Sequence, residues 1–303
     1  MMISVLVPVY GVASYIEECL VSLFEQTCQE LEYIFVDDCS PDDSIDILQR
    51  VVKRYPQRQG QVHIIRHEQN RGLGAARATA LQAAHGDFVM VVDSDDVLPV
   101  TAIETLWRRQ QETGADMVDG AFRQLTPEGL QAPVLPWHGS RERLLRLMLV
   151  QNVVYHQLWG RLVRRSVYTD NDINSIEGVN MAEDYAVTPR LLYCASRAWT
   201  DEVVYHYRVN AQSTFADNLT TRHIESFLRA NGAVYSFMTA HDVGHRYRCA
   251  LHIGLLRACA VAQRVGWDDE ETARLLGYRL PRVLRHAPLY LIYLVAKRLY
   301  TLF

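Results

Sequence analysis

Acidic residues gather at two places in the sequence, and each place directly follows a short apolar run. Asp37-Asp38-Cys39-Ser40-Pro41-Asp42 follows residues 33–36, and Asp93-Ser94-Asp95-Asp96 follows residues 88–92. Carboxylates that are brought together repel one another unless a cation binds between them. Sites made only of oxygen favour hard ions such as Mg²⁺ or Mn²⁺, and these ions commonly hold a diphosphate and neutralise the charge that develops as it leaves. The two clusters therefore predict a metal and nucleotide site.

A simpler interpretation is that each cluster caps the helix that follows it. Ser40 and Asp43 suit that role, because short polar side chains accept hydrogen bonds from the first turn of a helix. Capping does not require Asp37, Asp38, Asp93 and Asp95 together. We therefore favour the metal and nucleotide interpretation.

The elements that would position these carboxylates alternate between strands and helices. The runs 3–7, 33–36, 62–66 and 88–92 are apolar enough to be strands buried on both faces. One helical pattern begins after Ser14, which forms a capping box with Glu17, and a second begins at Ser40. A third covers the alanine-rich residues 74–84. This alternation indicates a mostly parallel α/β sheet flanked by helices. Such sheets bind ligands beyond the carboxyl ends of their strands, which is where both acidic clusters fall.

From about residue 220 the pattern becomes helical, which predicts a sheet domain over residues 1–215 and a helical C-terminal extension over residues 216–303. Residues 288–303 are rich in leucine and tyrosine and carry Lys297 and Arg298. This segment could lie on an anionic membrane surface, pack on the first domain or join another subunit, and the sequence leaves all three open. The apolar stretch 289–296 is too short to span a bilayer, which takes about 20 residues.

Composition narrows the class of protein. The net charge of −4 argues against nucleic-acid binding, and a hydrophobic content of 49% supports a full core. The six cysteines form no CxxC pair and the N-terminus carries no signal-peptide pattern, so we expect a cytoplasmic protein with buried, reduced thiols.

Four segments resemble the successive motifs of the family 2 glycosyltransferases, in the expected order and spacing. The resemblance covers roughly residues 1–215 and is strongest up to Pro99. It implies the GT-A fold, a nucleotide-diphospho-sugar donor, most often a UDP-sugar, and Mg²⁺ or Mn²⁺. The segments are Val5-Leu6-Val7-Pro8-Val9-Tyr10, Val36-Asp37-Asp38-Cys39-Ser40-Pro41-Asp42, Asn70-Arg71-Gly72-Leu73-Gly74-Ala75-Ala76-Arg77 and Val92-Asp93-Ser94-Asp95-Asp96.

The resemblance also implies roles for single residues. Asp38 would bond the base of the nucleotide, and the backbone of Pro8, Val9 and Tyr10 would line the same pocket. Asp95 would be the main metal ligand, with Asp93 near the ribose or the metal and Ser94 beside the nucleotide. Arg77 would either meet the donor or form a salt bridge to one of the aspartates.

Later segments match the family less closely. Glu177-Gly178-Val179-Asn180-Met181-Ala182-Glu183-Asp184 resembles the family's Glu-Asp segment, which makes Asp184 the general base; the alternative is that it only opens a helix. A single carboxylate base implies direct displacement and inversion at the anomeric carbon. Trp159 is either core or a platform for a sugar, and Arg208 either reaches the diphosphate or is an exposed arginine.

Together these features predict an inverting glycosyltransferase that works in the synthesis of bacterial cell-surface polysaccharide or glycolipid. The acceptor would be a saccharide or a lipid-linked molecule, met in the cytoplasm or on the inner face of the membrane, and an oligomer is compatible with the sequence. The Gln-x-x-Arg-Trp signature of processive synthases is absent, so we expect one sugar per encounter. The alternatives are an inactive sugar- or partner-binding protein and a sugar nucleotidyltransferase, but Pro8-Val9-Tyr10-Gly11 is not the glycine-rich loop of the latter.

Overall fold

The computed structural model describes residues 2–151, 155–209, 220–242, 244–281, 284 and 287–302. It divides into two compact units, each built from three separate stretches of the chain. The predicted boundary at residues 215 and 216 lies outside the described residues. The first unit is Met1–His138, Leu158–Gly178 and Cys194–Ala216, and the second is Gly139–Gln157, Val179–Tyr193 and Asp217–Phe303.

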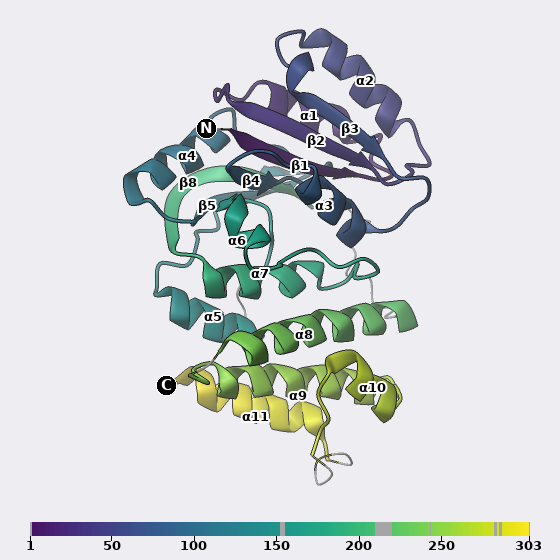
Figure 1. Cartoon of the computed structure of the whole chain (residues 1–303), viewed down its shortest axis with the longest axis vertical. Helices are drawn as coiled ribbons and strands as arrows, with labels where there is room; N and C mark the ends of the chain where they lie inside the picture. The colour runs from purple at the N-terminus through teal and green to yellow at the C-terminus, as the bar shows by residue number, and fades with distance from the viewer. Residues whose placement is uncertain are drawn as a thin grey trace. The chain divides into compact units, whose positions relative to one another are not determined.

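The first unit is built on one eight-stranded sheet (Figure 1). Its order is β3-β2-β1-β4-β7-β5-β6, and β8 pairs with β5. The first four strands run parallel, β7 is antiparallel to both neighbours, and β8 runs parallel to β5. This arrangement confirms the mostly parallel α/β sheet. The strands are β1 (Ile3–Val9), β2 (Leu31–Asp37), β3 (Val62–Arg66), β4 (Phe88–Val91), β5 (Met117–Thr126), β6 (Gly129–Leu130), β7 (Arg161–Arg164) and β8 (Arg197–Arg208).

The core lies around the central strands. β1, β2 and β4 are buried along their whole length, as predicted. Tyr33 of β2 is fully buried, its ring meets Phe24 edge-on at 5.2 Å, and its hydroxyl donates to the carbonyl of Leu23 at 2.7 Å. The prediction that residues 62–66 are buried on both faces is wrong, because β3 is the edge strand and most of its side chains face solvent.

The capping box predicted for the first helix is absent, and the second helix begins later than predicted. Helix α1 carries no side-chain cap, and α2 begins at Ser44 rather than at Ser40. Ser40 Oγ instead accepts from the amide of Gly11 at 2.8 Å. Asp42 bonds both sides, because Oδ2 accepts from the amide of Ala13 at 2.9 Å and Oδ1 from the amide of Ser44 at 3.1 Å. The helices of this unit are α1 (Ile16–Phe24), α2 (Ser44–Arg54), α3 (Leu73–Gln82), α4 (Ala102–Thr113) and α6 (Arg165–Thr169), with a short 3₁₀ turn η1 (Gln59–Gln61).

The second unit is helical in its described residues, which agrees with the pattern seen in the sequence. Its close packing needs glycine: a Cβ on Gly254 would lie 2.1 Å from the carbonyl oxygen of Leu149, so α9 and α5 touch backbone to backbone. Among the described residues, no helix combines the length and apolarity needed to cross a membrane. The helices are α5 (Arg141–Leu149), α7 (Glu183–Cys194), α8 (Thr221–His241), α9 (Arg248–Arg264), α10 (Asp269–Leu276) and α11 (Leu289–Leu302).

The cysteines differ in exposure more than the composition suggested. All six are free thiols, and Cys19 and Cys259 are buried. Cys249 is exposed, so the expectation of uniformly buried thiols is wrong.

Candidate active site

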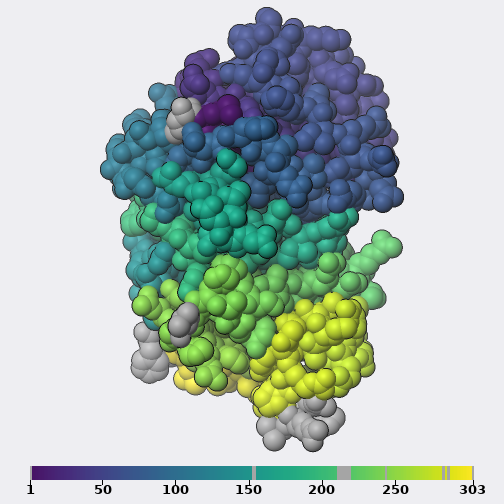
Figure 2. All heavy atoms as spheres, in the orientation of Figure 1, coloured from purple at the N-terminus to yellow at the C-terminus, as the bar shows by residue number. Residues whose placement is uncertain are grey.

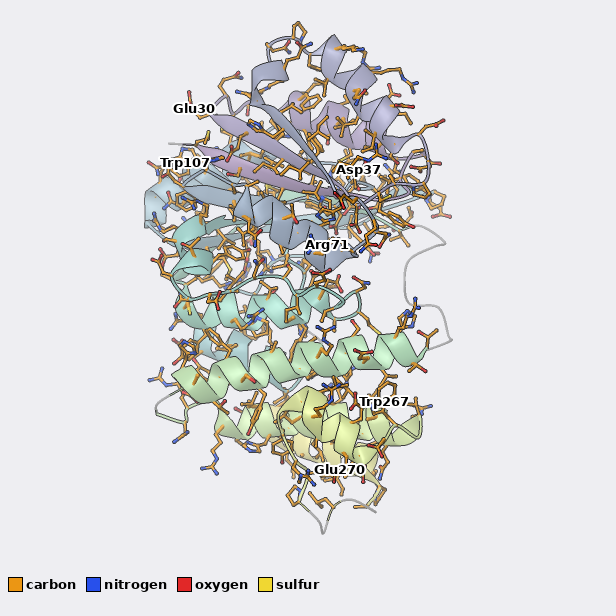
Figure 3. The ribbon with its side chains drawn as sticks, turned by 45° about the vertical axis from the view of Figure 1, so that its right-hand side comes forward. Glu30, Asp37, Arg71, Trp107, Trp267 and Glu270 are labelled. Atoms are coloured by element: carbon orange, nitrogen blue, oxygen red, sulfur yellow. The ribbon has the colours of Figure 1, made fainter. Side chains whose placement is uncertain are left out.

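Three loops that carry motif residues leave the sheet side by side. β1 pairs with β2 on one side and β4 on the other, with Val9 opposite Asp37 and Leu6 opposite Val91. The carboxyl ends of the three strands therefore share one edge of the sheet, and Asp37 and Arg71 lie together at that edge (Figure 3). Tyr10, the first residue after β1, is 50% exposed and offers an aromatic face to solvent.

Asp38 is buried, and both oxygens of its carboxylate accept hydrogen bonds from the protein itself. Oδ1 accepts from Nδ1 of His67 at 2.7 Å and from the amide of Arg71 at 2.9 Å, and Oδ2 accepts from the amide of Gly72 at 2.7 Å. Because an ionised carboxylate only accepts, Nδ1 of His67 must carry the hydrogen. Asp38 therefore anchors the loop between β3 and α3, and its bond to a nucleotide base stays a prediction.

The turn Asp93-Ser94-Asp95-Asp96 after β4 is held from β8. The Tyr205 hydroxyl accepts from the amide of Asp93 at 3.1 Å and donates to Asp96 Oδ2 at 2.7 Å. The amide of Arg208 donates to Asp96 Oδ1 at 2.7 Å. Trp159 is buried against the same tyrosine, with ring centroids 4.4 Å apart, so Trp159 belongs to the core and not to a sugar platform.

Two arginines place positive charge on this turn. Nη2 of Arg77 donates to Asp93 Oδ1 at 2.8 Å, and its side chain is 3% exposed, so the salt bridge expected as one alternative is present. Nε of Arg208 donates to the carbonyl of Asp95 at 2.8 Å, and Nη2 bonds Glu18 at 2.5 Å. With a side chain only 17% exposed, Arg208 is not the exposed arginine of the other alternative.

An exposed ion pair joins two further loops of the first unit. Nε and Nη2 of Arg71 donate to the two carboxylate oxygens of Glu177 at 3.1 and 2.7 Å. Arg71 is itself one of the residues that Asp38 anchors, so this pair links that loop to the segment that contains Glu177.

Asp184, the predicted base, lies in the first turn of α7 in the second unit. The residues before it are fixed by Ser226 of α8. Oγ of Ser226 accepts from the amides of Asn180 and Met181 at 2.9 and 2.8 Å and donates to the carbonyl of Met181 at 2.9 Å. Ala182 then takes a left-handed conformation with φ +61°. The role of Asp184 as base stays a prediction.

Comparison with known proteins identifies the family. Residues 4–170 match the family described as Glycosyl transferase family 2. The chain belongs to this family. EpsJ of Bacillus subtilis (strain 168), described as an uncharacterised glycosyltransferase, is 28% identical over 95% of this chain and 87% of its own length.

Two more comparisons extend the match. The poly(ribitol-phosphate) beta-glucosyltransferase of Bacillus spizizenii is 28% identical over 89% of this chain, which spans 43% of that enzyme. The structure of S. aureus TarS 1-349 in complex with UDP-GlcNAc aligns with 99% of this chain and 92% of its own, with a TM-score of 0.65 and 20% identity. This likeness confirms the expected GT-A fold.

The metal that glycosyltransferases of this fold commonly use was expected between carboxylates from two strand ends. The described residues contain no group of three or more His, Cys, Asp or Glu arranged around an ion, and Asp38 is bonded to His67 instead. Asp93 and Asp95 still fit an ion that also takes diphosphate oxygens, because Mg²⁺ is usually held by one or two carboxylates plus phosphate. Burial, followed by the charges of Asp93 and Asp95, raises the pKa of Asp96 to about 8.

Several residues that shape the candidate site were missed in the sequence. His67 directly follows the predicted strand 62–66, so its place at the carboxyl edge was a usable signal. Tyr205 lies three residues before Arg208, but its hydroxyl bonds to the turn depend on the pairing of β8 with β5. Ser226 gave no signal, because it lies in the helical region where no motif was recognised.

Proposed function

We propose that this protein is an inverting, non-processive glycosyltransferase that moves a sugar from a UDP-sugar to a hydroxyl of a saccharide or lipid-linked acceptor. The reaction serves the synthesis of cell-surface polysaccharide or glycolipid and takes place in the cytoplasm, at the inner face of the membrane. The observation that carries the proposal is the acidic turn 93–96 at the end of β4, braced by Arg77 and Tyr205.

The geometry at the neighbouring strand ends supports a nucleotide donor. Tyr10 presents a half-exposed ring on which a base can stack. Pro8 and Val9, the last two residues of β1, directly precede it. The structural neighbour holds UDP-GlcNAc on the same fold. The relative that acts on poly(ribitol phosphate) supports a polymeric cell-surface acceptor.

The charges of the site suit the departure of a diphosphate. Asp93 and Asp95 would hold Mg²⁺ or Mn²⁺, which when bound would neutralise the leaving diphosphate. Arg208 adds a positive charge that is fixed by Glu18 and by the carbonyl of Asp95, and a fixed charge needs no reorganisation during the reaction. Asp184 takes the proton of the acceptor hydroxyl, and a single base of this kind performs direct displacement with inversion.

The test compares Asp184→Asn with the wild-type enzyme. The variant should bind the donor with unchanged affinity by calorimetry and lose at least about 100-fold in transfer, the usual contribution of a general base. The product of the wild-type enzyme should have inverted anomeric configuration by NMR. The matched control is Asp170→Asn, the same change on an exposed carboxylate.

Two results would contradict the proposal. Full transfer by Asp184→Asn would remove this residue from the reaction. Donor binding by the wild-type protein without any donor hydrolysis or transfer would identify an inactive binding protein on the same fold.

A further inference from the structure

The C-terminal helix α11 is apolar on both of its faces. Leu289 and Tyr293 pack inward, each 2% exposed, and the Tyr293 hydroxyl lies 3.3 Å from the carbonyl oxygens of Val150 and Gln151. A helix that is apolar all round is normally covered all round. The uncovered face carries five large side chains that are 42–60% exposed: Tyr290, Leu291, Leu294, Val295 and Leu299.

The charge around this face is positive although the whole chain is acidic. Residues 220–303 hold twelve Arg and Lys against six Asp and Glu, a net charge of +6. Residues 1–219 hold nineteen Arg and Lys against twenty-nine Asp and Glu, a net charge of −10. No acidic residue occurs from residue 272 to residue 303. Such a segregation of charge favours an anionic partner for the C-terminal region.

Two of the four acidic residues at positions 268–271 are paired with arginines. Glu270 pairs with Arg279 at 2.6 Å, and Glu271 pairs with Arg274 at 2.5 Å. Helix α9, which packs against α11, carries three arginines and no acidic residue. The cations of α11, Lys297 and Arg298, therefore have no carboxylate on either helix.

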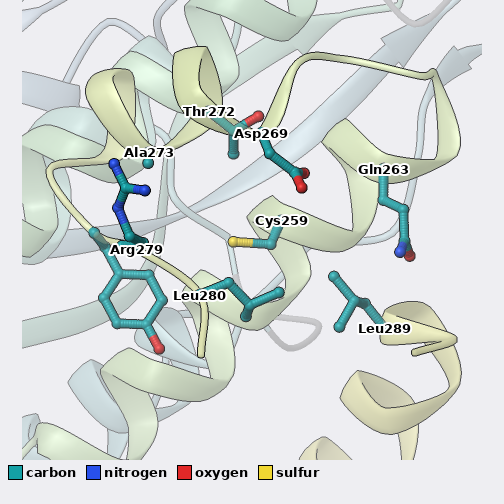
Figure 4. Close-up of a pocket in the computed structure, with 9 residues that line it drawn as sticks. Cys259, Gln263, Asp269, Thr272, Ala273, Arg279, Leu280 and Leu289 are labelled. Atoms are coloured by element: carbon teal, nitrogen blue, oxygen red, sulfur yellow. The ribbon is translucent and has the colours of Figure 1, made fainter. Parts of the chain in front are cut away.

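A groove of about 610 Å³ lies on α9 and the segment after α10. Ile253, Leu256 and Leu280 make it apolar, and His245, Arg248 and His252 add a basic rim. Leu280 also lines a small cavity, together with Cys259 of α9 and Leu289 of α11 (Figure 4). Leu280 therefore connects the groove to the start of α11. The yellow atoms at the front of Figure 2 include α10, which precedes this segment.

We propose that α11 and this groove dock on the anionic surface of a lipid bilayer. The exposed leucines would enter the boundary between headgroups and acyl chains, while Lys297, Arg298 and Arg248 would meet lipid phosphates. A second copy of this chain fits less well, because two surfaces of the same positive charge repel each other. The inference concerns the second unit alone and does not depend on the proposed sugar transfer.

Vesicle flotation with the full chain tests the proposal. The protein should float with vesicles of phosphatidylglycerol and phosphatidylcholine, stay unbound with phosphatidylcholine alone, and be released in high salt. Leu291→Asp and Arg298→Glu should each lower the binding constant at least about tenfold. Leu135→Asp changes a leucine of similar exposure, 50%, in the first unit and should bind as the wild type. Circular dichroism should be the same for all variants.

Three results would overturn the proposal. They are equal binding to neutral vesicles, no binding to anionic vesicles, and a reduction by Leu135→Asp as large as that by Leu291→Asp. A concentration-dependent dimer in sedimentation that Leu291→Asp dissolves, with no vesicle binding, would show that the face joins two copies instead.

Discussion

The hydroxyl of Tyr205 bonds both ends of the acidic turn, accepting from the amide of Asp93 at 3.1 Å and donating to the carboxylate of Asp96 at 2.7 Å. Asp95, the proposed metal ligand, lies between these two residues in the sequence. One side chain of β8 therefore sets the shape of the turn on β4. Because the tyrosine ring is fully buried against Trp159, the hydroxyl has little freedom to move.

Tyr205→Phe should lower transfer activity about 10–100-fold, as the loss of a residue that orients metal ligands typically does. The ring and its packing on Trp159 remain, so the free energy of unfolding should fall by only about 1–3 kcal/mol, the cost of leaving buried groups without a partner. Steady-state kinetics over a range of Mn²⁺ concentrations measures the transfer activity, and chemical denaturation measures the free energy of unfolding.

The matched control is Tyr207→Phe, whose ring also stacks on Trp159 at 5.3 Å. It should keep both the activity and the dependence on Mn²⁺. If both variants lost activity equally, the effect would come from packing, and the orienting role of the Tyr205 hydroxyl would be refuted.

Asp38 and the Arg71–Glu177 pair should differ sharply in their effect on stability. Asp38→Ala leaves three donors without an acceptor in a buried place, and should destabilise the protein by about 2–5 kcal/mol. A double-mutant cycle with Arg71→Ala and Glu177→Ala should give a coupling of at most about 1 kcal/mol that shrinks in salt, because both side chains are exposed. A coupling as large as the Asp38 effect would contradict this assignment.

Ser226→Ala should impair transfer while leaving the affinity for the donor unchanged. The serine fixes the backbone at Asn180 and Met181, just before α7, and does not belong to the strand ends. We expect kcat to fall about tenfold, since a small displacement of a catalytic group is costly. Ser226→Thr keeps a hydroxyl and should recover part of the activity. A loss of donor affinity with unchanged kcat would exclude a role in positioning Asp184.

Glu32 should make stability depend on pH. Burial raises the pKa of Glu32, but bonds from Ser4 and from the amides of His85 and Gly86 outweigh it and hold the pKa below the ordinary value of 4.5. A carboxyl whose pKa is lowered by folding stabilises the folded protein at pH values above its pKa in the unfolded chain. This stabilisation is lost as the pH falls through its pKa in the folded protein. Glu32→Gln should therefore cost about 1–3 kcal/mol at neutral pH and much less in acid.

Denaturation curves across the acid range measure this difference, with the exposed Glu30→Gln as the control. A gap between Glu32→Gln and the wild-type protein that stays constant with pH would show that Glu32 does not titrate differently in the folded state.

Four of the eight strands, β1 to β4, could be predicted from the sequence because each is a short apolar run, whereas β5 to β8 were not predicted. Residues 62–66 match β3 in extent. Their exposure was not predictable, since the place of a strand at the edge depends on which other strands pair. The start of α2 was misplaced for a related reason: Ser40 bonds a loop about 30 residues earlier, and Asp42 bonds both that loop and the amide of Ser44, where the helix begins.

Part of the candidate site could also be predicted from the sequence, and part could not. The carboxylates of the turn were visible as a motif, and parallel strands placed them at one edge. The partners that fix them come from distant parts of the chain, such as Tyr205 for Asp96 and His67 for Asp38. Carboxylates from two strand ends were expected around one ion because only their place at the sheet edge was known, and not the groups that already bond Asp38.

The most direct test of the account is calorimetric titration of UDP-sugars into the protein with and without Mn²⁺, for the wild type and for Asp95→Ala. Asp46→Ala, a change on the helix α2, is the control. We predict that Mn²⁺ strengthens binding at least about tenfold in the wild type and the control, and that Asp95→Ala removes this gain while the fold is kept. Equal dependence on Mn²⁺ in Asp95→Ala and the wild type would contradict the central claim that the turn after β4 holds the donor through a metal ion.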